Sequence, residues 1–322
     1  MTNNKKLVSL VIPCYNEEAS LPALYDALEE LMAENSNYNW EILLINDGSS
    51  DHTIDLIHQL HQQDSKFCYI DLTRNFGKEN ALLAGFDYTS GDCTIIMDAD
   101  LQHPVSVIPQ MLAKWEEGYD DVYGKRLSRG KESWLRKQSS LIFYKLLQKS
   151  ARCDILPNVG DFRLLDRKCI VELRKFRESE RYTKGMYAWI GFNKTYVEFE
   201  TQDRVAGESH MNYRSLMHLA VDGITSFSVA PLKWAAYLGI IVSIMAFVFM
   251  VYTLIHTWIY GDPVAGYPTL MTTILFLSGV QLIALGVMGE YLGKIFIESK
   301  KRPVYLVKEA FTLKHTNAEQ NL

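Results

Sequence analysis

The chain has 322 residues, of which 48% are hydrophobic and 22% charged, an ordinary globular composition that is long enough for about two domains. Its formal net charge of -5 does not provide the basic field of a general nucleic-acid binder, so no nucleic-acid partner is expected. The 5 cysteines include no C-x-x-C pair and are odd in number, which argues against a disulfide framework or a zinc site and favours reduced thiols in a cytosolic domain.

The first 125 residues alternate between strand-like and helix-like patterns. The first apolar run ends near Pro13 without a small-residue cleavage site, so it is interpreted as a strand and not as a signal peptide. Strands are predicted at 7–15, 40–47, 66–75 and 92–100, with helices at 20–34, 49–63 and 78–89 between them. Farther on, 160–173 predicts a short strand and a helix, and 196–202 predicts a strand. This alternation predicts right-handed crossovers and an open, mostly parallel α/β sheet.

Polar residues cluster where each of the first four strands ends. The clusters lie at 16–18, 46–51, 74–78 and 98–100. Each cluster alone could be a turn or a helix cap. The carboxyl ends of parallel strands share one edge of a sheet, however, and ligands bind there. The coincidence of four clusters therefore favours a ligand site at that edge.

The fourth cluster contains Asp98 and Asp100, two carboxylates separated by one residue directly after a buried strand. Like charges this close repel, and burying them is costly unless a positive charge lies beside them. A turn that caps the next helix is the alternative interpretation. The residues alone leave both interpretations open.

A basic segment, Lys125–Lys137, follows the predicted sheet strands and includes Arg126, Arg129 and Lys131. It could be a solvated loop that leads into a helix, or a mobile loop that closes over anionic phosphates. Both interpretations remain open from the residues alone.

Two long stretches contain no Lys, Arg, Asp or Glu, one between Lys233 and Asp262 and one between Asp262 and Glu290. Each is long enough to cross a hydrocarbon core of about 30 Å, so two transmembrane helices are predicted, at about 234–260 and 268–289. Basic residues flank the pair but are absent from its short connecting loop, and the positive-inside rule then places both termini in the cytoplasm. The expected protein is multi-pass in the cell membrane.

The predicted organisation has four parts. Residues 1–211 form a cytoplasmic α/β domain, and 212–232 form an amphipathic region that lies in the membrane interface. Residues 233–297 form a two-helix anchor, and 298–322 form a cytoplasmic tail. Because two-helix anchors can pack together, a homo-oligomer is also expected.

The motifs VIPCYNEE, INDGSSD, RNFGKENALLAG and DADLQHP, in this order and spacing, resemble those of a family 2 glycosyltransferase with the Rossmann-like GT-A fold. The later GDFRLLDR and RVAGESHMNYRSL, with the two C-terminal spans, resemble the polyprenyl-phosphate glycosyltransferases. That group includes the bactoprenol glucosyltransferases and is related to dolichyl-phosphate mannose synthase. The resemblance covers about residues 7 to 305.

The resemblance implies roles for individual residues. It implies a nucleotide-sugar site made of Pro13, Tyr15, Glu17, Asp47, Lys78, Asp98 and Gln102, with Asp47 accepting a hydrogen bond from uracil. It implies that Asp98 and Asp100 hold a Mg²⁺ or Mn²⁺ ion, with Gln102 beside it, and that Asp161 is a catalytic base or positions the acceptor. It also implies phosphate or acceptor contacts from Arg204 and Ser209. The basic segment adds Arg126, Arg129 and Lys131 as candidates for the same contacts. One departure is His210, which stands where relatives usually carry lysine.

The implied reaction is inverting transfer of a sugar, with glucose as the first choice, from a UDP-sugar to polyprenyl (undecaprenyl) phosphate. It would take place at the cytoplasmic membrane face and serve the modification of cell-envelope glycans. The second pKa of a phosphate monoester is about 6, so the acceptor is already largely anionic at pH 7 and needs no general base. The alternatives are mannose or GlcNAc transfer, a processive polysaccharide synthase, whose Q-x-x-R-W motif is absent, and a catalytically silent membrane scaffold.

Overall fold

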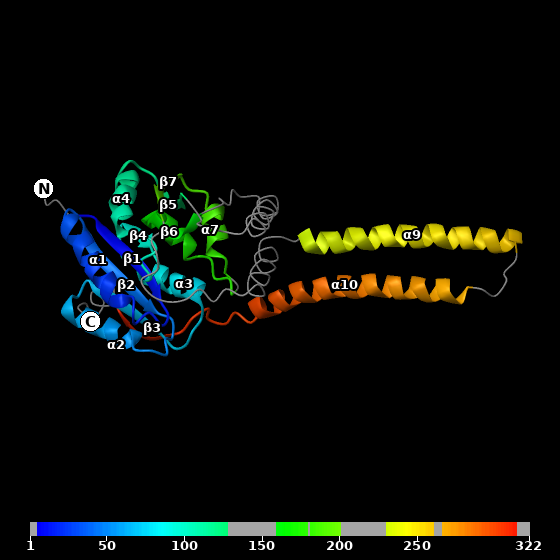
Figure 1. Cartoon of the computed structure of the whole chain (residues 1–322), viewed down its shortest axis with the longest axis horizontal. Coiled ribbons are helices and arrows are strands. Elements are labelled where there is room, and N and C mark those ends of the chain that lie inside the picture. The colour runs from blue at the N-terminus through cyan, green and yellow to red at the C-terminus, as the bar shows by residue number, and fades with distance from the viewer. Residues whose placement is uncertain (1–4, 128–158, 180, 201–229, 261–265, 314–322) are drawn as a thin grey trace.

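The structure, a computed structural model, describes residues 5–127, 159–179, 181–200, 230–260 and 266–313. An α/β domain carries a long helical hairpin that extends away from it (Figure 1). The strands are β1 (Leu7–Cys14), β2 (Asn39–Asn46), β3 (Phe67–Leu72), β4 (Cys93–Ile96), β5 (Asp121–Arg126), β6 (Val159–Asp166), β7 (Lys194–Phe199) and β8 (Val307–Phe311). The helices are α1 (Leu21–Glu34), α2 (Thr53–Gln63), α3 (Lys78–Tyr88), the 3₁₀ turn η1 (Val105–Val107), α4 (Ile108–Glu116), α6 (Arg167–Leu173), α7 (Thr183–Trp189), α9 (Ala230–Tyr260) and α10 (Tyr267–Ser299).

These strands form a single sheet in the order β7-β5-β6-β4-β1-β2-β3-β8. β1 pairs in parallel with β2 and β4, β2 pairs in parallel with β3, and β5 pairs in parallel with β7. β6 is antiparallel to both of its neighbours, and β8 is antiparallel to β3. The strands β1 to β5 and β7 therefore point the same way, and their carboxyl ends meet at one edge. The predicted α/β fold with a mostly parallel, Rossmann-like sheet is confirmed.

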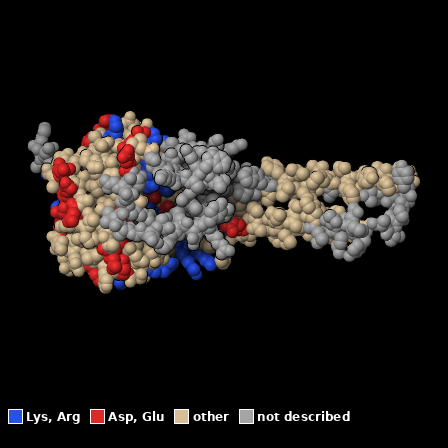
Figure 2. Space-filling view, viewed as in Figure 1, with Lys and Arg blue, Asp and Glu red and all other residues tan. Residues whose placement is uncertain are grey.

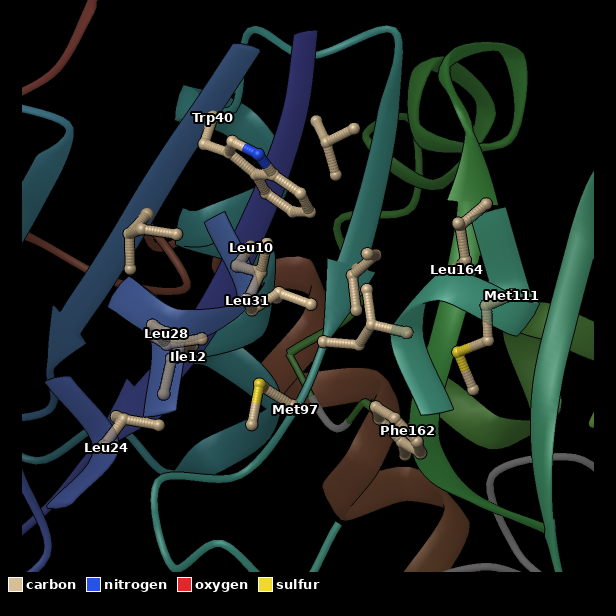
Figure 3. Packing of buried hydrophobic residues seen from close by; sticks show 14 of the residues in the cluster. Leu10, Ile12, Leu24, Leu28, Leu31, Trp40, Met97, Met111, Phe162 and Leu164 are labelled. Carbon is tan, nitrogen blue, oxygen red and sulfur yellow. The ribbon is translucent and has the colours of Figure 1, made fainter. Parts of the chain in front are cut away.

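The sheet is covered on both faces, which explains its nearly continuous apolar strands. Side chains of a strand alternate between the two faces. Leu10 and Ile12 of β1 pack with Leu24 and Leu28 of α1 on one face (Figure 3). Val11, between them in sequence, belongs to the opposite cluster with residues of α3, α6 and α7. The apolar runs of the sequence are thus the central layer of a three-layer domain.

Two elements between the predicted units, α4 and β5, were not predicted. β5 ends at Arg126, so the first two residues of the basic segment 125–137 are strand and not loop. Lys125 pairs with Glu198 of β7 at 2.8 Å, which shows that this end of the segment is tied into the sheet. The sequence interpretation of Lys125 and Arg126 as loop residues was wrong.

The hairpin consists of α9 and α10, which run side by side (Figure 1). Within the described residues, one helical stretch, Phe276–Ser299, is long and apolar enough to cross a membrane. The apolar stretch found in α9, Tyr237–Phe249, is shorter. The prediction of two spans is therefore not confirmed as it stands, although both helices are long enough in residues, at 31 and 33.

The segment after α10 returns to the α/β domain as β8. Val307 at the start of β8 pairs with Leu72, the last residue of β3. The connection from α10 therefore reaches the sheet at the carboxyl edge of its parallel strands. Tyr305 donates a hydrogen bond of 2.6 Å from its hydroxyl to Asp87 of α3 and holds this segment in place.

This return corrects the predicted domain boundary at residue 298. The part of the tail up to residue 313 includes β8, an edge strand of the same sheet, and is not a separate appendage. Lys308 lies 2.9 Å from the buried Asp71 of β3, and Tyr69 of β3 donates to Glu309 at 2.9 Å. These contacts are long-range, so no local pattern in the sequence predicted them.

Candidate active site

A pocket of about 290 Å³ lies at the carboxyl edge of the sheet, close to the lower size limit of small-molecule sites. Its lining comprises Pro13, Cys14, Tyr15, Glu17, Asp47, Asn75, Gly77, Lys78, Asp98, Ala99 and Asp100. All four polar clusters of the sequence contribute to this lining. The structure therefore brings together the predicted residues Pro13, Tyr15, Glu17, Asp47, Lys78, Asp98 and Asp100.

Asp161 reaches the same edge for a different reason. It lies near the start of β6, and Ile96 of β4 pairs with Arg163 two residues farther along β6. Because β6 is antiparallel to β4, its beginning lies where β4 ends. Asp161 consequently lies beside Asp98, although 62 residues of sequence separate them.

The ammonium group of Lys78 joins these two carboxylates. Its Nζ lies 2.5 Å from Oδ1 of Asp98 and 3.3 Å from Oδ2 of Asp161. Burial alone would lower the pKa of Lys78, but the charges of Asp98 and Asp161 outweigh burial and raise it. This bridge supplies positive charge beside the Asp98–Asp100 pair, whose two carboxylates are close in sequence and only partly exposed.

Asp161 is held as an anion. Burial would raise its pKa, but Lys184, Lys78 and Arg163 together lower it below the usual value. Its Oδ1 is buried and has no hydrogen-bond partner among the described residues. Asp161 therefore offers a charged acceptor oxygen to a bound molecule, but its lowered pKa makes it a weak base.

Asp47 fixes the loop that forms one wall of the pocket. Its two carboxylate oxygens accept the backbone N–H groups of Phe76 at 2.7 Å and Gly77 at 2.9 Å. Gly77 has a φ of 90°, which glycine adopts without strain, and α3 with Lys78 begins directly after it. Burial raises the pKa of Asp47, and these two bonds oppose that rise. Each oxygen can still accept a second bond, so contact with uracil stays a prediction.

The loops after β1 and β2 support each other. Ser50 donates its backbone N–H to Oδ1 of Asn16 at 2.8 Å, and Glu17 donates its backbone N–H to Oγ1 of Thr53 at 2.8 Å. Part of the polar character of these clusters is therefore structural. Tyr15 lies in the pocket lining and is 48% exposed, so its ring is accessible to a ligand.

The remaining predicted site residues do not line the pocket or lie outside the described residues. Gln102 donates its backbone N–H to Oδ1 of Asp100 at 3.1 Å but is not part of the pocket lining. Arg126 ends β5 and lies 3.4 Å from the ring of His103 at the Asp161 side of the site. Arg129, Lys131, Arg204, Ser209 and the departure at His210 lie outside the described residues.

The chemistry of the pocket fits a hard divalent cation in part. Asp98 and Asp100 provide carboxylate oxygens from one short turn, as Mg²⁺ or Mn²⁺ would require. The ammonium group of Lys78 already shows that a cation is favourable beside Asp98. In the parts of the chain that are described, no three Asp, Glu, His or Cys side chains form a complete ligand set. A cation here would therefore take its other ligands from a bound diphosphate and from water.

Sequence reasoning missed a group of charged side chains near the pocket that are buried and paired with one another or with polar groups. Glu79, next to Lys78, accepts hydrogen bonds from the backbone N–H of Thr183 at 3.0 Å and from its hydroxyl, which ties α7 to the start of α3. Arg163 pairs with the equally buried Asp121 at 3.0 Å and stacks on the ring of Tyr187 at 3.7 Å. The available signal was Arg163 within the apolar run FRLL, since an arginine is seldom buried without a partner.

Comparison with known proteins agrees with this architecture. Residues 9–174 match the family Glycosyl transferase family 2, and residues 230–295 match the family GtrB C-terminal hairpin. The chain therefore belongs to glycosyltransferase family 2, and its domain has the GT-A type of α/β fold. Within that family it carries the C-terminal hairpin of the GtrB group, which is the pair α9 and α10.

Its relatives match along nearly their whole length. It is 44% identical to the bactoprenol glucosyl transferase of Shigella phage SfV over 94% of this chain and 98% of that one. It is 42% identical to an uncharacterized glycosyltransferase of Synechocystis over 97% and 98%, and 42% identical to a prophage bactoprenol glucosyl transferase homolog of Escherichia coli over 94% and 98%. A solved structure of glucosyl-3-phosphoglycerate synthase from Mycobacterium tuberculosis with Mn²⁺, UDP and phosphoglyceric acid is 19% identical, with a TM-score of 0.47 over 68% of this chain and 76% of that one.

Proposed function

We propose that this glycosyltransferase moves a hexosyl group, with glucose as the first choice, from a UDP-sugar to a polyprenyl phosphate at the cytoplasmic face of the cell membrane. The names of the relatives at 42 to 44% identity support glucose and a bactoprenol acceptor. A role in modifying cell-envelope glycans is part of the same proposal.

One observation supports the proposal that the acceptor is a membrane lipid. The pocket lies at the carboxyl edge of the parallel strands, and the chain returns from α10 to the sheet at the same edge, where Val307 pairs with Leu72. The site and the apolar hairpin are therefore on the same side of the domain. An acceptor whose long tail stays in a bilayer requires this arrangement, whereas a water-soluble acceptor does not.

The proposed membrane topology has both α9 and α10 spanning the bilayer, with both termini in the cytoplasm. Exposed Lys300, Lys301 and Arg302 follow α10, and basic side chains gather where the domain meets the hairpin (Figure 2). Basic residues on this side agree with the positive-inside rule. The boundaries at 211, 232 and 297, and a homo-oligomer packed through the hairpin, remain part of this proposal.

The donor would bind along the pocket wall made by Tyr15, Glu17 and Asp47, with its diphosphate toward Asp98 and Asp100. A bound Mg²⁺ or Mn²⁺ would stabilise the negative charge that builds up on the leaving diphosphate. Lys78 lies beside Asp98, so its ammonium group would also stabilise negative charge on the oxygens of the leaving diphosphate.

The acceptor would approach from the side of Asp161. Because its phosphate is already largely anionic at pH 7, no proton has to be removed. Asp161, held ionised by its neighbours, would orient the acceptor or stabilise positive charge on the sugar ring. A single in-line displacement then inverts the anomeric centre, and an α-linked donor yields a β-linked lipid phosphate sugar.

The test uses the purified full chain in detergent with undecaprenyl phosphate, Mn²⁺ or Mg²⁺, and a panel of labelled UDP- and GDP-sugars. The measurement is the label transferred into the lipid phase. Asp100→Ala is the inactivating variant, and Glu117→Ala is its control, because Glu117 forms a largely exposed pair with Lys114 of α4.

Transfer from UDP-glucose that is lost in Asp100→Ala and kept in Glu117→Ala is the expected result. Transfer from a UDP-GlcNAc or GDP-mannose donor instead would retain the reaction class and correct the sugar. Binding of UDP without transfer to lipid from any donor would refute the proposal and favour a catalytically silent scaffold.

A further inference from the structure

The imidazole of His103 is the most thoroughly buried titratable ring beside the site. It follows the Asp98–Asp100 turn and is only 2% exposed. Its ring stacks on Phe162 of β6 with centroids 4.9 Å apart, and Phe199 of β7 meets it edge-on at 5.8 Å. Two aromatic neighbours therefore hold the ring plane in one orientation.

The one side chain within hydrogen-bond distance of this ring, in the described part of the protein, is Arg126. Its Nη2 lies 3.4 Å from Nε2 of His103. A guanidinium group can only donate, so Nε2 must accept and the ring hydrogen must be on Nδ1. Burial lowers the pKa of His103, Arg126 and Lys78 act in the same direction, and Asp98 and Asp100 oppose them. The ring is thus a neutral acceptor for Arg126.

This arrangement leaves His103 imperfectly satisfied. Its Nδ1 is buried and has no hydrogen-bond partner among the described residues. A phenylalanine ring would fit the same two aromatic contacts without burying an unpaired donor. Stability alone therefore does not explain the imidazole, and the atom that distinguishes it from a phenyl ring is the acceptor Nε2.

Arg126 in turn lies near Asp161, at the carboxyl edge of the sheet. It is the last residue of β5, and its neighbour Lys125 points to the opposite face and pairs with Glu198. A Cβ at Gly160 would lie 4.0 Å from Nη2 of Arg126 and 3.9 Å from Nε2 of His103. Gly160 directly precedes Asp161, so the guanidinium group lies near Asp161, beside the pocket and outside its lining.

We propose that His103 is a positioning residue that fixes the guanidinium group of Arg126 for binding a phosphate group of a substrate. The inference rests on the proposed function, in which Arg126 contacts phosphate. The phosphate can be the diphosphate of the nucleotide donor or the monoester of the lipid acceptor, and the two have the same chemistry. His103 acts through Arg126 and does not touch the reacting atoms.

The experiment is a double-mutant cycle in the full chain in detergent, with His103→Phe, Arg126→Ala and the double variant, and with His103→Gln as the conservative change. His103→Phe keeps an aromatic ring and removes the acceptor, whereas the side-chain oxygen of His103→Gln can accept from Arg126. Thermal unfolding, affinity for UDP, affinity for a short-chain polyprenyl phosphate and steady-state transfer are measured for each. The two affinities are measured by calorimetry and do not depend on turnover.

His103→Phe should unfold at the wild-type temperature or above it. It should weaken one of the two affinities by about tenfold, which lies within the coupling range of residues in contact. His103→Gln should restore part of the loss, and His103→Phe should have no further effect in the Arg126→Ala background. A weaker affinity for UDP would assign the donor diphosphate, and a weaker affinity for the lipid phosphate alone would assign the acceptor.

Wild-type affinities in His103→Phe, or losses that add in the double variant, would overturn the proposal. A fall in unfolding temperature that His103→Gln does not rescue would also overturn it, because the histidine would then be structural. If the wild-type chain transfers no sugar, the proposed function fails, but the binding cycle still decides whether His103 acts through Arg126.

Discussion

Replacing Lys78 with methionine tests the electrostatic centre of the site. The ammonium group lies 2.5 Å from Asp98 and 3.3 Å from Asp161, and methionine keeps most of the side-chain volume without the charge. Asp161 would lose its Lys78 contact and retain only the more distant charges of Lys184 and Arg163. Its pKa should therefore rise toward the ordinary value, and the folded chain should lose stability at neutral pH.

The size of the loss follows from the partial burial of the ion pair. Breaking an ion pair costs from about 1 kcal/mol when it is exposed to about 3 to 5 kcal/mol when it is fully buried. The side chain of Lys78 is 42% exposed, so solvent screens part of this interaction. The lower end, about 1 to 2 kcal/mol of unfolding free energy, is therefore the expected cost of Lys78→Met.

The sign of the pH dependence is fixed by the directions of the two pKa shifts. The folded pKa of Asp161 is lowered, so its stabilising contribution is present above the unfolded value of about 3.9 and is lost as pH falls through the folded value. The folded pKa of Lys78 is raised, so its contribution is present below about 10.4 and is lost as pH rises through the folded value. The wild type should exceed Lys78→Met in stability between about pH 4 and pH 10 and lose this advantage outside that window.

The assay is urea unfolding of the detergent-purified chain, followed by tryptophan fluorescence at pH 7, inside the window, and at about pH 3, below it. Lys114→Met is the matched control, because Lys114 forms an exposed pair with Glu117 that should contribute at most about 0.5 kcal/mol. Transfer activity should also fall by about a hundredfold in Lys78→Met, as when one charge-stabilising group is removed from an active site. Equal stability of Lys78→Met and Lys114→Met at pH 7 would refute the assigned role of the bridge.

Three further changes probe the site and its support. Asp100→Asn should weaken Mn²⁺ binding in the presence of UDP by about tenfold or more. The affinity is measured from the signal of free Mn²⁺ in electron paramagnetic resonance, and unchanged binding would exclude Asp100 as a ligand. Arg163→Met leaves Asp121 buried without its cation and should cost about 3 to 5 kcal/mol in urea unfolding, whereas adding Asp121→Asn should recover part of that loss. Gly48→Ala places a side chain at φ 65° against the backbone of residues 74 and 75, so it should lower both the unfolding temperature and the affinity for UDP. Wild-type values for both would contradict the close approach of the Gly48 backbone to residues 74 and 75.

The local elements of the domain could be predicted because each carries its own periodic pattern. The runs that became β1, β2, β3 and β4 are apolar because helices cover both faces of the sheet. Strand direction in such alternating units is also constrained, since crossovers between parallel strands are right-handed. The sequence alone therefore placed the four polar clusters at one edge, and the pocket at that edge confirms this.

Elements that depend on distant pairing could not be predicted in the same way. The sequence indicates that 160–166 is a strand, but not that it inserts antiparallel between β4 and β5 and so delivers Asp161 to Asp98. It also gave no sign that Val307–Phe311 returns to the edge of β3. The free energy that selects these partners comes from contacts between residues far apart in the chain, which local patterns do not record.

The sequence by itself determined the chemistry available to this protein, namely two carboxylates after a buried strand, a lysine and a polar loop at neighbouring strand ends, and a long apolar hairpin. Only the tertiary structure decided which of these groups meet. Lys78 bridges Asp98 and Asp161, and His103 holds Arg126, because the order and direction of strands bring their ends together. The physical reason is that a charge or a hydrogen bond acts over a few ångströms of space, whatever the separation along the chain.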